Sequence, residues 1–318
     1  MRKHGTHILL VIALVAACGW TAAAGGGLAA SVVVTELVVA PNGRLPQLAG
    51  GYLLEAPGYA TSPAEAKICL LNVAARSWRE LNPWPEEPTA ELVVKGVQPL
   101  KDGRIVVGLR AVSWANERAE VVAVFDKEGR RQSWFRTNPY AWDTFAVDED
   151  QSLWMFGACP DYLAHECGMD DPLVRHYSLD GKLLDGFLPF RSFPEGALHV
   201  PERKVGSDWV GLSRAAVGIY VAATAEWIEL DRKGRILARQ KMELPSDSHG
   251  FRFARSRSGR LVVGGSGMAA LLEWNPQTAT FEPRPDFSGY LLGAEDGKLV
   301  LATFVVGKET TLHYHEFE

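Results

Sequence analysis

The sequence is poor in the features that define several familiar classes of protein. Its 318 residues include four cysteines, too few for the disulfide framework of a small secreted scaffold. The 33 basic residues are outnumbered by 38 acidic ones, so the chain lacks the positive charge with which nucleic-acid-binding proteins neutralise phosphates. No apolar run after the first thirty residues is long enough to cross a bilayer. What remains is an acidic globular chain, 47% hydrophobic and able to bury a large core.

The N-terminus has the order of charge and hydrophobicity that is typical of an export signal. Arg2 and Lys3 precede an apolar run at 8–17, which is too short to span a membrane. The run ends in Val15-Ala16-Ala17-Cys18, which resembles the lipobox of bacterial lipoproteins, where the cysteine is lipidated and becomes the first residue. Small residues at 22–30 would instead suit an ordinary signal peptidase.

Either cleavage route takes the chain out of the cytoplasm. We expect residues 1–17 to be a signal peptide of the lipoprotein type and residues 18–31 to be a flexible Gly/Ala tether. The predicted location is the cell envelope or periplasm, with a lipid anchor on Cys18 as the only contact with the membrane. Residues 32–318 then form the folded part.

The folded part is built from a repeat, which is an apolar strand, a polar turn and a second apolar strand. Its copies recur roughly every 50 residues. The residues that open the turns are Asn72, Asp126, Asp180, Asp231 and Asn275. Each copy predicts a β-hairpin.

A second hairpin type alternates with the first. Its turns are Asp102-Gly103, Asp150-Gln151, Ser258-Gly259 and Asp296-Gly297, each followed by a short apolar strand. Two hairpins per period make a four-stranded antiparallel blade, and six periods predict an all-β, six-bladed β-propeller. Good helix formers at 64–75 and 226–244 offer a helical alternative, but regular turns and clustered β-branched residues favour strands.

The two ends of the chain provide an independent indication of a closed ring. The last repeat offers three strands, at 290–294, 298–304 and 311–317. The β-branched segment 32–39 precedes the first complete repeat and is free to supply the fourth strand of that blade. Such pairing would remove the exposed edge that an open array leaves.

The repeat resembles the six-bladed β-propellers of the NHL and TolB-like kind, particularly exported bacterial ones. The resemblance rests on the segments 125–129, 177–181 and 230–234 and on the Asp-Gly-x-apolar hairpins, and it covers roughly residues 32–318. It implies a fold. It carries little about function, because propellers of this kind serve unrelated tasks.

Two cysteines in one loop offer a structural or a chemical role. Cys159 and Cys167 would form a disulfide in an oxidising compartment. With His165 and Glu166 they would instead provide zinc ligands, and a third possibility is two free thiols. Cys69 lies in an apolar run and is expected to be a small buried side chain.

Candidate ligand-binding residues precede the first strand of each repeat, where a propeller forms one rim of its central channel. They are Trp142, Asp143, Asp208, Trp209, His249, Arg252 and Tyr290. If they converge, the charged groups would bind a cation or perform acid-base work and the aromatic rings would form flat walls. In the alternative interpretation the aspartates bond local backbone and the aromatics fill the space between blades.

Three functions follow from these residues. The first is a non-catalytic binding or scaffold module for a protein, peptide or small ligand, without nucleic acid. The second is a metal-dependent lactonase or esterase, in which Asp143 and Asp208 hold calcium or zinc and His249 is the general base. The third is a purely structural envelope part. His313 and His315 would share one side of a strand and provide two ligands of a separate metal site.

Overall fold

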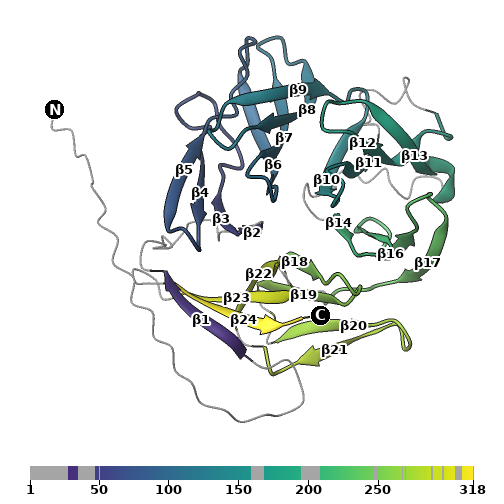
Figure 1. Cartoon of the computed structure of the whole chain (residues 1–318). Coiled ribbons are helices and arrows are strands. Elements are labelled where there is room, and N and C mark those ends of the chain that lie inside the picture. The colour runs from purple at the N-terminus through teal and green to yellow at the C-terminus, as the bar shows by residue number, and fades with distance from the viewer. Residues whose placement is uncertain are drawn as a thin grey trace.

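The computed structural model is a ring of six antiparallel sheets around a central axis (Figure 1). It describes residues 28–34, 47–49, 51–158, 168–194, 208–245, 249–266, 268, 270–287, 289–295, 297–304 and 310–317. Each sheet has four strands, so the predicted six-bladed β-propeller is confirmed. Within these ranges the one helix is a 3-10 turn, Phe190–Ser192, and no helix is long and apolar enough to span a bilayer.

The blades are numbered here in chain order, and their strands run from the axis outward. Blade 1 contains β2 (Gln47–Ala49), β3 (Tyr52–Glu55), β4 (Ile68–Asn72) and β5 (Ser77–Leu81). Blade 2 contains β6 (Glu91–Pro99), β7 (Ile105–Val112), β8 (Arg118–Phe125) and β9 (Arg131–Arg136). Blade 3 contains β10 (Ala141–Val147), β11 (Leu153–Ala158), β12 (Pro172–Tyr177) and β13 (Leu183–Pro189).

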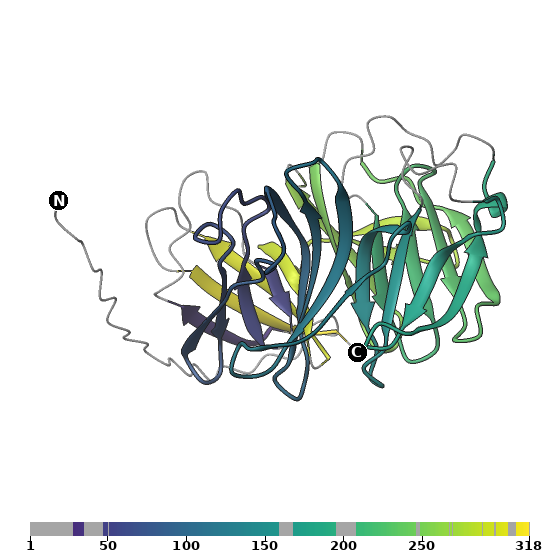
Figure 2. The same cartoon turned by 90° about the horizontal axis from the view of Figure 1, so that it is seen from above.

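The second half of the chain continues the same order. Blade 4 contains β14 (Trp209–Leu212), β15 (Val217–Val221), β16 (Glu226–Leu230) and β17 (Ile236–Lys241). Blade 5 contains β18 (His249–Arg255), β19 (Leu261–Ser266), β20 (Leu271–Asn275) and β21 (Thr280–Arg284). Blade 6 contains β22 (Tyr290–Glu295), β23 (Lys298–Phe304), β24 (Thr310–Glu316) and, outermost, β1 (Leu28–Val34). Figure 2 shows the ring turned by 90°.

The N-terminal strand closes the ring as predicted. β1 pairs antiparallel with β24, with Val33 opposite Thr311 and Ala30 opposite Tyr314. In Figure 1 the purple first strand lies beside the yellow last one. The pairing begins at Leu28, four residues before the predicted domain start, so the last part of the predicted tether is strand. Without β1, the edge of β24 would leave backbone N–H and C=O groups unpaired, and pairing with this edge makes the small residues before 32 part of a strand. Their composition alone does not predict a strand.

The repeated turn is stabilised by its first side chain. The carboxylate of Asp126 accepts hydrogen bonds from the backbone N–H groups two and four residues later, at 2.9 and 2.8 Å, and Asp231 does the same at 2.8 and 2.9 Å. In blade 3 this position belongs to Ser178, whose hydroxyl accepts the N–H of Lys182 at 3.2 Å. The prediction that Asp180 opens that turn was therefore wrong by two residues, because serine also provides the oxygen that the turn requires.

The glycine of this turn also packs against the neighbouring blade. Gly181 and Gly234 have φ values of +91° and +76°, which strongly favour glycine. A Cβ atom on Gly181 would overlap the Phe135 ring of blade 2, and one on Gly234 would overlap the Phe187 ring of blade 3. The repeat therefore encodes contact between blades as well as a turn within each blade.

The core is divided among the joints between blades. Each of the six hydrophobic clusters formed by described residues spans one pair of adjacent blades. The joint of blades 1 and 2, for example, buries Leu70 against Val107, and the joint of blades 6 and 1 buries Leu53 with Val300. Because each blade contributes to the clusters on both sides, the ring holds together through its joints.

Candidate functional site

A cavity of about 1390 Å³ occupies the axis of the ring. Its wall is made by the innermost strands, mainly β6, β10, β14, β18 and β22, together with the turns that follow them. Both charged and apolar side chains line it. A mixed, concave surface of this kind is where small ligands bind in most proteins.

Four innermost strands are interrupted where they border the cavity. The pairing register shifts at Lys95 in β6, at Asp143 in β10, at 250–251 in β18 and at Leu292 in β22. Lys95, Asp143, Phe251 and Leu292 all line the cavity. A β-bulge re-aims a side chain, and bulges are common beside functional sites. The bulges thus bring one residue each from blades 2, 3, 5 and 6 to the cavity wall.

Lys95 belongs to a buried charge network in blade 2. Its side chain and that of Glu120 are each 1% exposed, and its Nζ lies 2.9 Å from Glu120 Oε2. Arg110 Nε donates to the other Glu120 oxygen at 2.6 Å. Lys95 also donates to the backbone carbonyl of Trp142 in blade 3, and its Nζ lies 4.4 Å from the centre of that indole. Burial lowers the pKa of Lys95, and the Glu120 carboxylate partly offsets this.

Asp208 and Trp209 border the cavity from blade 4. Asp208 is 4% exposed and accepts the backbone N–H of Ala222 at 2.8 Å. Burial, together with the Asp208 charge, raises the pKa of Tyr220 to about 12. The Trp209 ring stacks on Phe253 at 5.3 Å and on Trp227 at 6.1 Å. Trp209 therefore lines the cavity as part of an aromatic stack between blades 4 and 5.

Arg252 adds a cationic group from blade 5. It lines the cavity, and its guanidinium carbon lies 5.1 Å from the centre of the Tyr290 ring in blade 6. Burial lowers the pKa of Arg252. The Tyr290 ring packs against the Arg252 guanidinium, and Tyr290 is not among the residues that line the cavity.

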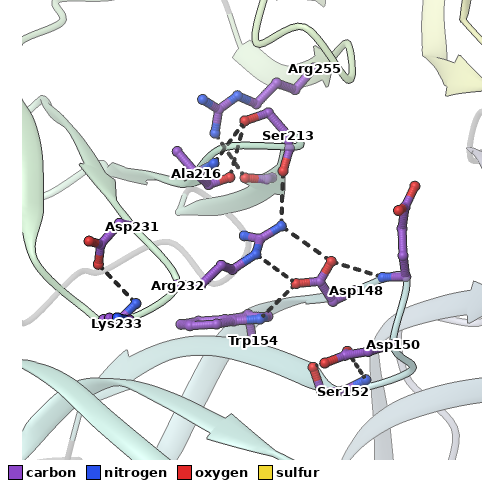
Figure 3. A network of polar contacts seen from close by, with 12 residues as sticks. Asp148, Asp150, Ser152, Trp154, Ser213, Ala216, Asp231, Arg232, Lys233 and Arg255 are labelled. Carbon is purple, nitrogen blue, oxygen red and sulfur yellow. Dashed lines mark hydrogen bonds and ion pairs between the residues drawn. The ribbon is translucent and has the colours of Figure 1, made fainter.

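A network of matched charges lines the part of the cavity that is formed by the turns (Figure 3). Arg232 Nε, from blade 4, lies 3.0 Å from Asp148 Oδ2 of blade 3, and the Trp154 indole N–H donates to the same oxygen at 3.2 Å. A second Arg232 nitrogen donates to the Ser213 carbonyl at 2.9 Å. His176 stacks on Trp154 at 4.2 Å, and burial lowers its pKa. These bonds join two blades, so we assign this network to the scaffold.

The structure brings together some of the predicted rim residues and separates others. Asp143, Asp208, Trp209 and Arg252 share the cavity wall. Trp142 does not, because it is fully buried in the joint of blades 2 and 3, with its ring over Gly108. The prediction that Trp142 forms a flat wall of the ligand site was therefore wrong. Gly108 has no side chain, which leaves room for the Trp142 indole between the blades. The side chain of His249 lies outside the described residues.

The remaining predicted sites give mixed outcomes. Cys18, Cys159 and Cys167 lie outside the described residues, as do His165 and Glu166. Cys69 is half-buried, and burial raises the pKa of its thiol. In the part of the chain that the structure describes, no group of three or more His, Cys, Asp or Glu residues is placed to hold a metal.

His313 and His315 contact other residues of blade 6, the sheet in which the two ends of the chain pair. The imidazole of His313 bridges two strands, with Nδ1 3.1 Å from the Ser31 hydroxyl and Nε2 3.0 Å from the Thr303 hydroxyl. His315 is 6% exposed and packs edge-on against Phe287 at 5.1 Å. Burial and the neighbouring His315 lower the pKa of His313. Both histidines thus contribute to packing around β24.

Sequence reasoning missed Lys95, Phe251 and Leu292 as cavity residues. A signal was present, because an isolated glycine inside a strand pattern suggests a bulge. Gly96 follows Lys95 directly, and Gly293 follows Leu292. Glycine alone does not say that the neighbouring side chain faces the axis, which depends on the position of the strand in the blade.

Six blades around an axial cavity define the chain as a six-bladed β-propeller. No family model and no curated protein matches it. It is similar in structure to a protein of unknown function from Bacteroides caccae, with 14% identity over 80% of this chain and 82% of that one and a TM-score of 0.47.

Two further solved structures have similar scores. One is an auxiliary nutrient binding protein from Bacteroides ovatus, with 8% identity, coverage of 89% and 73%, and a TM-score of 0.49. The other is virginiamycin B lyase from Staphylococcus aureus, with 10% identity, coverage of 89% and 99%, and a TM-score of 0.43. Likenesses this distant carry no argument about function.

Proposed function

We propose that this chain is an exported binding protein that holds a small molecule or a short peptide segment in its central cavity, without catalysis. The single observation that supports this is the set of bulges, which bring residues from four blades to one cavity wall. Regular innermost strands would complete the ring equally well. The interruptions therefore point to a use of the axis beyond architecture.

The wall indicates what such a ligand would look like. Asp143 of blade 3 and Arg252 of blade 5 contribute charges of opposite sign to the wall, and both residues are partly exposed. Phe251, which is also partly exposed, contributes apolar surface. We infer a ligand with polar or charged groups on one side and apolar groups on the other, because unmatched charges are costly to desolvate.

A binding experiment with matched variants tests this proposal. The chain from Cys18 is titrated with panels of short peptides and oligosaccharides, and its intrinsic tryptophan fluorescence is followed because Trp209 borders the cavity. Asp143→Ala or Arg252→Ala should weaken a ligand of the panel by about tenfold or more, the cost of one charged hydrogen bond. Asp185→Ala, on the exposed outermost strand of blade 3, is the control. Equal binding by all variants would place the ligand elsewhere.

We also propose that the propeller belongs to the exported NHL and TolB-like group and is lipid-anchored through Cys18 at the cell envelope. The basic, apolar and cysteine-ending order of the first eighteen residues supports the anchor, and the repeated Asp-Gly hairpins support the group. Mass spectrometry of the protein from the membrane fraction should find an acylated Cys18 at its N-terminus, and Cys18→Ala should release the chain to the soluble fraction. An unmodified N-terminus beyond Cys18 would favour ordinary cleavage.

The alternative function, a calcium- or zinc-dependent lactonase or esterase, keeps one supporting observation. Asp143 and Asp208 line the same cavity. The described residues add no third ligand that would complete a site with them, so they do not fit a divalent ion by themselves. A stoichiometric metal that is lost on Asp208→Asn, measured by elemental analysis, would bring this alternative forward.

A further inference from the structure

Two arginines of the cavity wall are held against β14 and the turn that follows it, and each has a counter-ion. Arg232 donates to the Ser213 carbonyl at 2.9 Å, and Arg255 donates to a carbonyl of β14 at 3.2 Å (Figure 3). Arg232 also pairs with Asp148 at 3.0 Å, and Arg255 pairs with Glu229. The positive charges of these two arginines are therefore matched within the scaffold.

Two further arginines lie on the innermost turns of the same two blades, and both are accessible. The backbone N–H of Arg214 in blade 4 donates to the carbonyl of Arg257 in blade 5 at 3.0 Å, so the two turns are joined at these residues. Arg214 is exposed, the Arg257 side chain is 41% exposed, and both residues line the cavity. A ligand in the cavity can therefore contact both side chains without opening a joint between blades.

This second pair of arginines has little compensating charge. Arg257 contacts the Glu149 carboxylate at 3.8 Å, and the Glu149 side chain is 70% exposed, so the ion pair is weak. The Arg214 side chain makes no hydrogen bond or ion pair with any residue that the structure describes. Neighbouring cations repel each other, and a concave wall with an excess of one charge attracts the opposite one. An anion that binds at both arginines would relieve their repulsion.

We propose that Arg214 and Arg257 bind an oxyanion group of the ligand, a carboxylate or a phosphate, and this proposal rests on the binding function proposed above. A guanidinium group suits such anions because it presents two parallel N–H donors to two oxygens. Two arginines on neighbouring turns would bind one anion from two sides. The ligand then has an anionic end at the turns of blades 4 and 5, and Glu149 competes with it for Arg257.

Titration with simple oxyanions tests the proposal. Inorganic phosphate or succinate is added to the exported protein at constant ionic strength, and the heat of binding is measured by calorimetry. We expect saturable binding, and the anion that binds more tightly identifies the group as phosphate or carboxylate. Arg214→Gln and Arg257→Gln should each weaken binding by about tenfold or more, the effect of losing a hydrogen bond between charged groups.

A matched control uses the same change of charge elsewhere. Arg136→Gln removes a 55% exposed arginine side chain on β9, outside the cavity lining, and should leave the affinity unchanged. A loss of affinity equal to that of Arg214→Gln would show that only the net charge matters. That result, or the absence of saturable binding of both anions, would overturn the proposal.

Two more substitutions separate recognition of an oxyanion from general attraction of negative charge. Arg214→Lys keeps the positive charge but lacks the paired donors, so it should lose most of the affinity that Arg214→Gln loses. Glu149→Gln removes the carboxylate that contacts Arg257 and should tighten binding by about twofold to fivefold. Unchanged affinity in both variants would contradict recognition by these two side chains.

The titration with peptides and oligosaccharides distinguishes failure of this inference from failure of the proposed function. A panel ligand whose binding depends on Asp143 but is unaffected by Arg214→Gln and Arg257→Gln would contradict the oxyanion site alone. Oxyanion binding that requires Arg214, with no panel ligand bound, would support this site and leave the binding of a larger ligand without its evidence. Circular dichroism of each variant establishes that the ring is folded before either result is interpreted.

Discussion

The outer hairpins and the innermost strands of this propeller follow opposite rules. The outer hairpins of blades 2, 3 and 4 repeat one turn, with an oxygen-bearing side chain at its start and a glycine at its end, and the turn packs against the preceding blade. Four of the innermost strands break their pairing and carry a different side chain at each break. The repeated turns thus stabilise the ring, and the irregular strands are concentrated at the cavity. This contrast supports the axis as the functional part.

The largest expected effect comes from breaking the buried charge network of blade 2. Glu120→Gln removes the carboxylate that contacts both Lys95 and Arg110, leaving the buried Lys95 cation without its ion-pair partner. We expect a loss of about 3 to 5 kcal/mol in the free energy of unfolding, measured by urea denaturation. Glu80→Gln, which removes a pair with Lys67 at a 60% exposed side chain, is the matched control and should cost under about 1 kcal/mol. Similar losses in both would show that burial does not set the difference.

A smaller effect is expected from breaking one repeated turn. Gly234→Ala places a side chain at φ +76° and against the Phe187 ring, and should cost about 2 to 3 kcal/mol. In a Phe187→Ala background the same substitution should cost only the backbone part, about 1 kcal/mol. Urea denaturation of the four proteins measures the coupling. Additive costs would mean that the turn and the neighbouring blade are independent.

The smallest effect concerns the sheet that joins the two ends of the chain. The pKa of His313 is lowered in the folded protein, so the unfolded chain binds the proton more readily. Its contribution to stability is present above the unfolded pKa of about 6.5 and is lost as pH falls through that value to the folded pKa. We expect His313→Gln to reduce the fall in the urea midpoint on acidification. An unchanged pH dependence would assign the effect to other groups, His315 among them.

Most of the fold could be predicted from local signals, and the site only in part. The turn at Asp150-Gln151 was recognisable without its glycine, and Gln151 adopts φ +67°. The start of the turn in blade 3 was predicted two residues too late, at Asp180 instead of Ser178, because aspartate is the more familiar residue at this position. Of the rim residues, Asp143, Asp208, Trp209 and Arg252 reach the cavity, whereas Trp142 is in a joint. Sequence position fixes which strand carries a side chain but not which way a bulge turns it.

By itself, the sequence determined most of the strands, their turns and the count of six blades, because each depends on alternating hydrophobicity and on residues only a few positions apart. The pairing of the two ends followed from the absence of a fourth strand in the last repeat. Only the tertiary structure decided that Lys95, Asp143 and Arg252 share one wall, and that Trp142 does not. These residues lie on different blades, and their meeting depends on how the blades pack around the axis and where a strand is interrupted. Such long-range geometry leaves no local pattern in the chain.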